Sequence, residues 1–240
     1  MGAERARGES VEAPSVAASG RGSRRLRSRL KRLIPRSLAI QRLQSSPHPT
    51  VLLTFDDGPH PEITPAVLQR LERHNARAVF FVVGRRARRA SALLERIQRA
   101  GHVIGNHSHL HRTRDVLAGP QTSLLRYYRD VARCRTIIER GTGTRATLFR
   151  PPGGWITPAT LLTPRLLGMR CVLWTREVQD WSFRTDEDAR VGAEKLLQVV
   201  APDDIVLLHD FNPCILVLLD TLLPGLRDRG YDLASGVDRL

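Results

Sequence analysis

From residue 49 onward, short apolar runs alternate with longer stretches in which apolar residues recur every three or four positions. The short runs are typical of buried strands, and the longer ones are typical of amphipathic helices. The predicted strands are 51–55, 79–83, 102–104, 147–149, 171–174, 205–208 and 231–233. Strands that alternate with helices indicate βα units and a parallel sheet.

The helices predicted between these strands are 64–75, 88–100, 123–139, 157–167, 186–200 and 214–229. Gly101, Gly168 and Gly230 directly follow three of them, where a glycine C-cap is expected. Seven strands with about six helices predict an α/β fold, a distorted TIM-like (β/α)7 barrel. An open doubly wound sheet is the alternative.

Composition divides the chain into two parts. A length of 240 residues suits one domain with a sizeable core, and 41% hydrophobic and 26% charged residues are ordinary for a globular protein. The net charge of +14 is unevenly spread, because residues 1–48 hold eleven Lys or Arg against three Glu. We therefore expect a basic leader over 1–48, disordered or partly helical, and a catalytic domain over 49–240.

The leader has two interpretations. Its stretch 23–43 places leucines among arginines, as in a helix that lies on an anionic membrane surface or an acidic polymer. A solvated basic tail would have the same composition. Neither a secretory h-region nor a long apolar run is present, which favours a cytoplasmic or membrane-peripheral location.

Three cysteines, Cys134, Cys171 and Cys214, are odd in number and lack a CxxC spacing. A disulfide framework or a cysteine-bound zinc is therefore not expected. We predict that all three are buried thiols, which pack as small apolar side chains.

Polar residues follow most of the predicted strands. In α/β barrels the carboxyl ends of the strands meet at one rim, and chemistry collects there. The residues expected at this rim are Asp56, Asp57, His107, His111, Arg150, Asp180, Trp181, His209 and Asp210.

Asp56 and Asp57 taken alone favour a solvated turn, because Asp-Gly-Pro is good turn chemistry. His107 and His111 change that interpretation, since imidazoles at i and i+4 can reach one cation. His109 at i+2 should point elsewhere. Two His and one Asp form a ligand set that leaves coordination positions open for water, as a hydrolytic metal requires.

With these residues in place, the chain resembles the polysaccharide deacetylase family, the NodB-homology domains of carbohydrate esterase family 4. The resemblance covers about residues 50–235 and implies a distorted barrel. Five segments carry it in order: Thr54-Phe55-Asp56-Asp57-Gly58-Pro59, His107-Ser108-x-x-His111, Arg150-Pro151-Pro152-Gly153, Asp180-Trp181 and Leu207-Leu208-His209.

The resemblance implies a metal-dependent hydrolase that removes N-acetyl groups from an amino-sugar polymer, chitin-like or peptidoglycan. Asp57, His107 and His111 would bind a divalent metal, Zn²⁺ first and Co²⁺, Mn²⁺ or Ni²⁺ otherwise. Asp56 would be the base, paired with Arg150, and His209 the acid, oriented by Asp180. A backbone N–H near Gly153 would hold the oxyanion, and Trp181 and Leu207 would wall the acetyl pocket.

Two positions depart from the family pattern. Gly153-Gly154-Trp155 stands where the family often has a tyrosine, so Trp155 is expected to stack on sugar in its place. Glu177 replaces a shorter acid. Neither change removes a ligand, base or acid.

Other functions stay open. A deformylase or deacetylase of a lipid-linked sugar, or another non-peptide C–N hydrolase, is the first alternative, and a glycan-binding relative without turnover is the second. Specific nucleic-acid binding is not expected, because the charge is concentrated in the leader and aromatic residues make up only 5%. The resemblance also implies a cell-envelope location, against the location that the leader favours.

Overall fold

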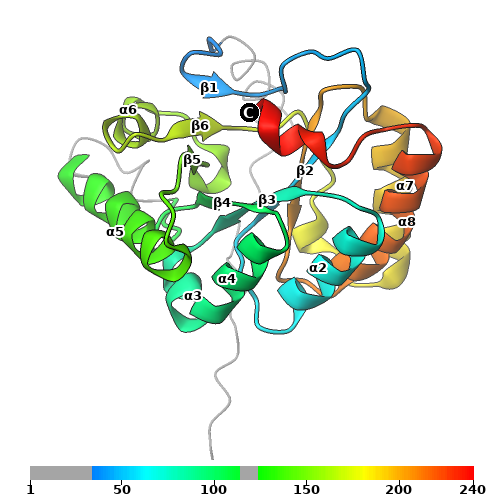
Figure 1. Ribbon diagram of the computed structural model, residues 1–240, viewed down its shortest axis with the longest axis horizontal. Helices are drawn as coiled ribbons and strands as arrows, with labels where there is room; N and C mark the ends of the chain where they lie inside the picture. The colour runs from blue at the N-terminus through cyan, green and yellow to red at the C-terminus, as the bar shows by residue number, and fades with distance from the viewer. Residues whose placement is uncertain (1–33, 114–123) are drawn as a thin grey trace, which may run out of the picture. The chain divides into compact units, whose positions relative to one another are not determined.

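The computed structural model describes residues 34–113 and 124–240, and Pro35–Leu240 form one compact unit. Its centre is a curled sheet (Figure 1). The sheet has eight strands in the order β1-β6-β5-β4-β3-β2-β8-β7, and every strand pair is parallel. The strands are β1 Ala39–Ile40, β2 Leu52–Asp56, β3 Ala78–Val82, β4 Val103–Asn106, β5 Leu148–Phe149, β6 Arg170–Val172, β7 Arg176–Glu177 and β8 Ile205–His209. The fold is the predicted distorted (β/α)7 barrel.

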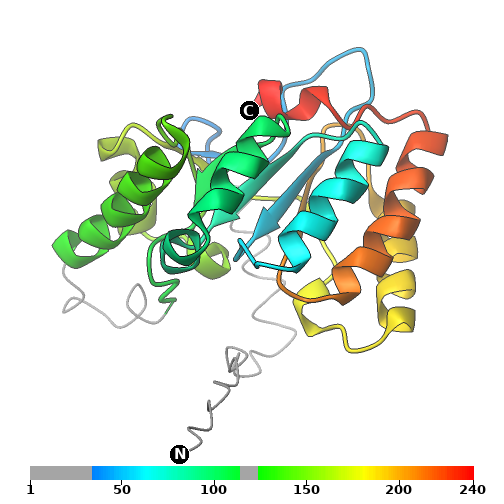
Figure 2. The same cartoon turned by 60° about the horizontal axis from the view of Figure 1, so that its bottom comes forward.

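Helices cover the outside of the sheet, with α5, α4, α2, α8 and α7 following one another around it (Figure 2). The helices are α2 Ile63–Arg73, α3 Gly84–Arg89, α4 Ser91–Arg99, α5 Leu124–Thr142, α6 Pro158–Leu166, α7 Asp186–Val199 and α8 Cys214–Asp228. The prediction of one helix over 88–100 is wrong, because Ala90 leaves the helical conformation and separates α3 from α4. Gly101, Gly168 and Gly230 all have positive φ, which confirms the predicted glycine caps.

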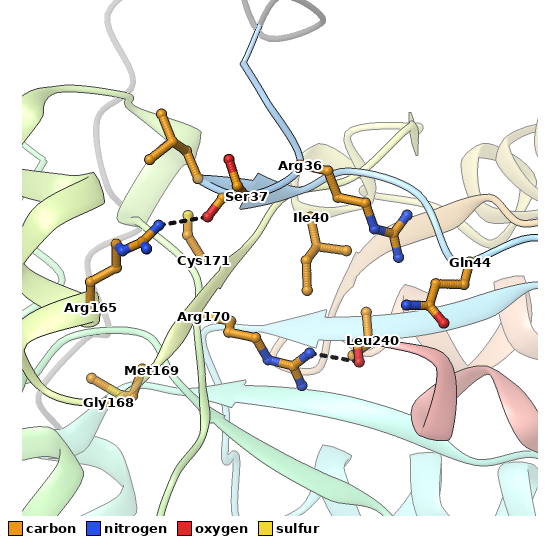
Figure 3. Close-up of a pocket in the computed structure, with 11 residues that line it drawn as sticks. Arg36, Ser37, Ile40, Gln44, Arg165, Gly168, Met169, Arg170, Cys171 and Leu240 are labelled. Atoms are coloured by element: carbon orange, nitrogen blue, oxygen red, sulfur yellow. Dashed lines mark hydrogen bonds between the residues drawn. The ribbon is translucent and has the colours of Figure 1, made fainter.

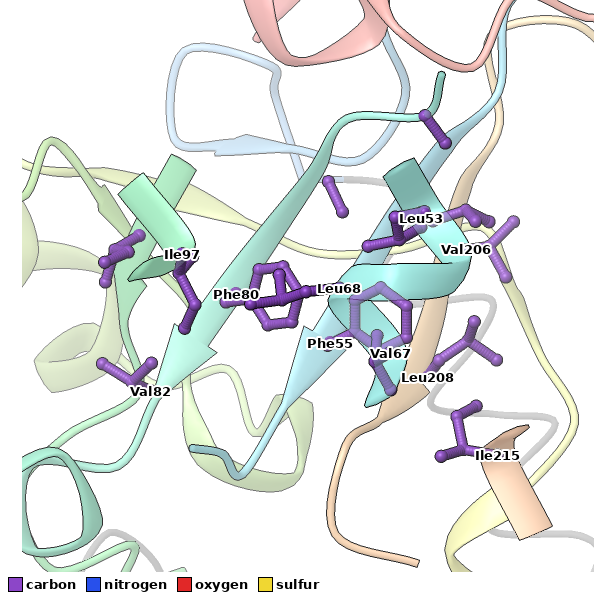
Figure 4. Packing of buried hydrophobic residues seen from close by; sticks show 14 of the residues in the cluster. Leu53, Phe55, Val67, Leu68, Phe80, Val82, Ile97, Val206, Leu208 and Ile215 are labelled. Carbon is purple, nitrogen blue, oxygen red and sulfur yellow. The ribbon is translucent and has the colours of Figure 1, made fainter. Parts of the chain in front are cut away.

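Alternation along the strands creates two apolar cores. On β2 and β3, Leu53, Phe55 and Phe80 face the helices, and the rings of Phe55 and Phe80 stack with centroids 5.0 Å apart (Figure 4). Their neighbours Leu52 and Phe81 face the barrel interior. Each fully buried side chain of this size contributes about 1.5–3 kcal/mol. The same alternation turns Asp56, at the end of β2, toward the interior.

The barrel is distorted where β6 and β7 follow one another in the chain yet lie near opposite ends of the sheet order. The linking residues bridge both ends: Leu173 N donates to Ile40 O at 2.7 Å, and Thr175 N donates to Ile205 O at 2.9 Å. The segment that links β6 to β7 therefore crosses from one end of the sheet to the other and narrows the interior of the barrel.

Two boundary predictions need correction. Residues 231–233 form no strand, and only a single bridge links Asp232 to Thr50. The domain begins earlier than residue 49, because β1 pairs with β6 and Ile40 and Leu43 are buried. Residues 35–48 thus belong to the barrel. The surface helix predicted within 23–43 is wrong over 34–43, where the chain forms a turn and β1. The rest of that stretch lies outside the described residues.

All three cysteines are free and buried, as predicted. Among the described residues, no helix combines the length and the apolar character that a membrane crossing requires.

Candidate active site

Arg150 fills the upper interior of the barrel and holds Asp56. It is fully buried, and its NH1 donates to Asp56 Oδ1 at 2.8 Å and to Thr54 Oγ1 at 2.7 Å. Its other donors reach the carbonyls of Val172 and Leu173, and the guanidinium stacks on the ring of Phe81 at 4.2 Å. The pair is thus fixed in position by both charge and packing.

Asp56 and His209 are register partners on the adjacent strands β2 and β8. Both therefore point to the same side of the sheet, into the mouth of the barrel. One layer below, Thr54 is the register partner of Leu207, which is buried. The residues predicted as base and acid thus lie at adjacent positions of one strand pair.

Asp57, His107 and His111 converge. Each offers one donor atom within 4.8 Å of the others, with Asp57 Oδ1 3.0 Å from His111 Nε2 and 3.6 Å from His107 Nε2. Asp57 Oδ1 is buried, and no donor among the described residues has the geometry of a hydrogen bond to it. A buried carboxylate oxygen is rarely left so unless an ion completes it. The donor set, two imidazoles and one carboxylate, fits a divalent cation such as zinc.

The protonation of this cluster also suits a cation. Burial lowers the pKa of His107 to about 4, against the opposing effect of the Asp56 carboxylate. His107 Nδ1 lies 2.8 Å from the carbonyl oxygen of Arg150, which can only accept, so the proton sits on Nδ1 and Nε2 presents its lone pair. Burial would raise the pKa of Asp57, but His111 and His107 outweigh it and hold that pKa well below its usual range. Metal ligands need these deprotonated forms.

His209 is in the opposite state. Burial would lower its pKa, but the buried Asp180 carboxylate, 3.0 Å from Nδ1, raises it to about 9. Asp180 Oδ2 also accepts from the backbone N–H of His209 at 2.7 Å. The imidazolium is thus both charged and oriented, and its side chain keeps 12% exposure at the mouth of the barrel. It can deliver a proton there.

The loop after β4 needs an unusual backbone to bring the histidines together. Ser108 and His111 both have positive φ, and Ser108 Oγ accepts from His111 N at 3.0 Å. Asn106 ties the loop to α5, since its amide donates to Val131 O and its Oδ1 accepts from Ser108 N. His109 lies outside the ligand group, as predicted.

A second network fixes the loop after β2, and the sequence assigned it no role. Arg86 donates to the carbonyl of Asp57. The buried Asp210 accepts from Thr64 Oγ1, and its carboxylate lies against Gly58, where a Cβ would meet Asp210 Oδ1 at 2.2 Å. Burial raises the pKa of Asp210 to about 7. The Asp57 loop is therefore held from two sides.

The residues predicted to contact the substrate differ in how far they are buried. Gly153 lies in the 3₁₀ turn Pro152–Gly154 with a φ of 62°, and a Cβ at this position would meet the Trp155 ring at 3.0 Å. Trp181 follows Asp180 directly and is 38% exposed. Leu207, by contrast, is a buried wall of the interior.

A cavity of about 390 Å³ lies at the other end of the barrel and contains none of these residues (Figure 3). Arg165 and Arg170 line it and donate to the carbonyls of Ser37 and Leu240. Its arginines thus tie β1 and the last residues to α6 and β6, which is a structural role.

Comparison with known proteins places the chain in a family. The family model described as "Polysaccharide deacetylase" matches residues 44–172, more than half of the chain. The chain belongs to the polysaccharide deacetylase family.

Individual relatives are consistent with this family assignment. The chain is 30% identical over 214 residues to the peptidoglycan-N-acetylglucosamine deacetylase PgdA of Listeria monocytogenes, which covers 88% of this chain and 43% of that protein. It therefore spans less than half of that relative. It is 34% identical over 200 residues to a chitooligosaccharide deacetylase of Sinorhizobium fredii, covering 78% of this chain and 90% of the relative. The solved structure of the peptidoglycan deacetylase PdaC from Bacillus subtilis superposes with a TM-score of 0.70 at 28% identity, covering 80% and 89% of the two chains.

Proposed function

We propose that this chain is a metal-dependent hydrolase that removes N-acetyl groups from an N-acetylglucosamine polymer or oligomer. The observation that carries the proposal is the pairing of Asp56 with His209 across one strand pair, beside the convergent donors of Asp57, His107 and His111. Amide hydrolysis needs an activated water, an oxyanion site and an acid for a poor leaving group. Residues at one rim of the barrel supply a group for each of these three requirements.

Asp57, His107 and His111 would hold the metal, with Zn²⁺ as our first choice and Co²⁺, Mn²⁺ or Ni²⁺ as alternatives. When bound, such an ion lowers the pKa of water and polarises a carbonyl oxygen. The second-layer bond from His107 to the Arg150 carbonyl fixes the orientation of that ligand.

Two side chains of the protein carry out the two proton transfers. Asp56 takes the proton of the attacking water, and Arg150 fixes the carboxylate that does so. His209, charged because of Asp180, protonates the departing amine. The N–H of Gly153 donates to the oxyanion, Trp181 and Leu207 bound the acetyl methyl, and Trp155 stacks on a sugar face.

The names of the relatives support the substrate class. They are named as deacetylases of peptidoglycan and of chitooligosaccharides, so an N-acetylated glycan is the partner we assign. As the place of action we propose the cell envelope, which the family resemblance implies, with a cytoplasmic or membrane-peripheral location as the alternative. An anionic membrane surface or acidic polymer as partner of the leader remains a prediction on residues outside the described part.

The test is acetate release from a short N-acetylglucosamine oligomer by metal-loaded protein, before and after chelation. We expect release that chelation abolishes and zinc restores. Loaded protein that carries one metal per chain yet releases no acetate would sink the proposal and favour the lipid-linked or other C–N substrates.

Asp56→Asn separates the enzyme from a glycan-binding relative. The variant should lose at least about 10²-fold in kcat because it lacks the base, and should keep its metal. Asp220→Asn, a surface change, serves as the control. Equal acetate release by both variants would contradict the assigned role of Asp56.

A further inference from the structure

A second cavity, of about 170 Å³, lies beside the histidine loop, between that loop and the first half of α5. We refer to it as the α5 groove. Among the described residues, its charged lining consists of Asp130 and four arginines, Arg112, Arg126, Arg129 and Arg133, and His109 also lines it. The groove thus carries a net positive charge at a surface where no role has been assigned.

Three of these arginines share one helix face. Arg126, Arg129 and Arg133 follow the i, i+3, i+7 spacing, so their side chains project to the same side of α5 and repel one another. All three are exposed, and none forms an ion pair with an acidic residue of the described chain. A concentration of like charge without partners disfavours the free protein and favours an anion that binds there.

Asp130 offsets only one of these positive charges. Its Oδ2 accepts from the backbone N–H groups of His109 and Leu110, at 3.1 and 3.4 Å. Both residues lie between the ligand candidates His107 and His111. The same carboxylate that lines the groove therefore fixes the loop that carries the metal donors, so the groove and the site share one wall.

We propose that the α5 groove is a subsite for carboxylate groups of the glycan, so that the preferred substrate is an acidic rather than a neutral acetylated glycan. The proposal rests on the deacetylase function above and narrows its substrate class. Guanidinium groups match carboxylates through paired N–H donors. The volume suits one acidic substituent of a sugar chain, and the groove borders the loop that carries His107 and His111.

The test compares the double variant Arg129→Gln/Arg133→Gln with a control, Arg96→Gln/Arg140→Gln. Arg140 is an exposed residue at the far end of the same helix and Arg96 an exposed residue of α4, so the net charge changes equally. The substrates are a glycan oligomer whose alternate sugars carry free carboxylates, the same oligomer with these groups amidated, and a neutral N-acetylglucosamine oligomer.

We expect the groove variant to lose about five- to tenfold in kcat/KM on the carboxylate oligomer, mostly through KM, as two exposed charge pairs would give. The amidated and neutral oligomers should be unaffected, and the control should behave as wild type. Equal losses in variant and control, or wild-type protein that treats the carboxylate and amidated oligomers alike, would overturn the subsite.

Binding measurements test the subsite independently of turnover. Kd values for the carboxylate and amidated oligomers, measured by calorimetry, should differ in the wild type and converge in the groove variant. If no oligomer is deacetylated, the proposed function fails, and the same Kd values still decide on the groove. Equal Kd values for both oligomers in the wild type would reject it.

Discussion

The ion pair between His209 and Asp180 sets the protonation of the proposed acid. The pKa of the imidazole, raised from 6.5 to about 9, keeps His209 charged through neutral pH. Because the folded value is the higher one, the pair stabilises the fold fully below pH 6.5, and this contribution is lost as pH rises through about 9. Activity that requires the charged acid should decline over the same alkaline range.

Asp180→Asn tests this coupling. The amide still accepts from the His209 N–H but removes the negative charge, so the alkaline limb of kcat should move down by about two pH units. A pH–rate profile measures it, with Asp220→Asn as a surface control. An alkaline limb that stays in place would show that another group sets it.

Arg150 contributes to the stability of the fold and also has a proposed positioning role. Arg150→Met should lower the free energy of unfolding by about 3–5 kcal/mol, because it leaves the Asp56 carboxylate buried and unpaired. Denaturant unfolding measures the loss. Adding Asp56→Asn should recover part of it, since the unpaired charge is then gone. Two losses that simply add would contradict this account.

The same residues show what a sequence discloses about a site. Asp56, Asp57, His107, His111, Arg150, Asp180 and His209 each lie at or after the carboxyl end of a strand, so their meeting at one rim could be predicted. The hydrogen bond from Arg150 to Thr54 joins residues 96 positions apart, and that from Thr64 to Asp210 joins residues 146 apart. No local pattern reports such contacts, because they depend on how the barrel closes.

At the scale of elements, predictability followed length. The longer strands and most of the helices have enough residues to display a period, and their positions agree within a few residues. The helix predicted over 88–100 is the exception, because Ala90 divides it into α3 and α4. The strands β1, β5 and β7 have two residues each, too few for any alternation, and only β5 was predicted, from the apolar run 147–149. The segment 231–233 has the apolar character of a strand, but α8 and the last turn leave it only one bridge to Thr50.

The loop that joins β2 to α2 offers an element-scale prediction. Gly58→Ala would place a methyl 2.2 Å from the buried Asp210 Oδ1, so the loop that carries Asp57 must shift. We expect metal affinity to fall by about tenfold or more, the usual effect of disturbing groups behind a ligand. Metal titration measures it. In the Asp210→Ala background, which makes room for the methyl, Gly58→Ala should cost less metal affinity than it does in the wild type. An equal cost in both backgrounds would point to backbone strain instead.

At the scale of the whole molecule, the boundary between leader and barrel has a measurable consequence. Charge predicted a break after residue 48, because the basic residues run on to Arg42. Packing puts it at Pro35, since Arg42 pairs with the buried Asp204 and Ile40 and Leu43 join the interior core. A basic composition thus concealed a short segment that completes the barrel.

Two truncations distinguish these boundaries. Removal of residues 1–34 should leave the Tm and the acetate release from a short oligomer unchanged, because Pro35–Leu240 form a compact unit. Removal of 1–48 exposes the surfaces that Ile40 and Leu43 cover and strips Asp204 of one arginine, which should cost about 3–6 kcal/mol of unfolding free energy. Calorimetry on both truncations measures the difference. Equal Tm values would restore the boundary at residue 48, whereas a loss already present in the shorter truncation would show that the first 34 residues contribute to the stability of the barrel.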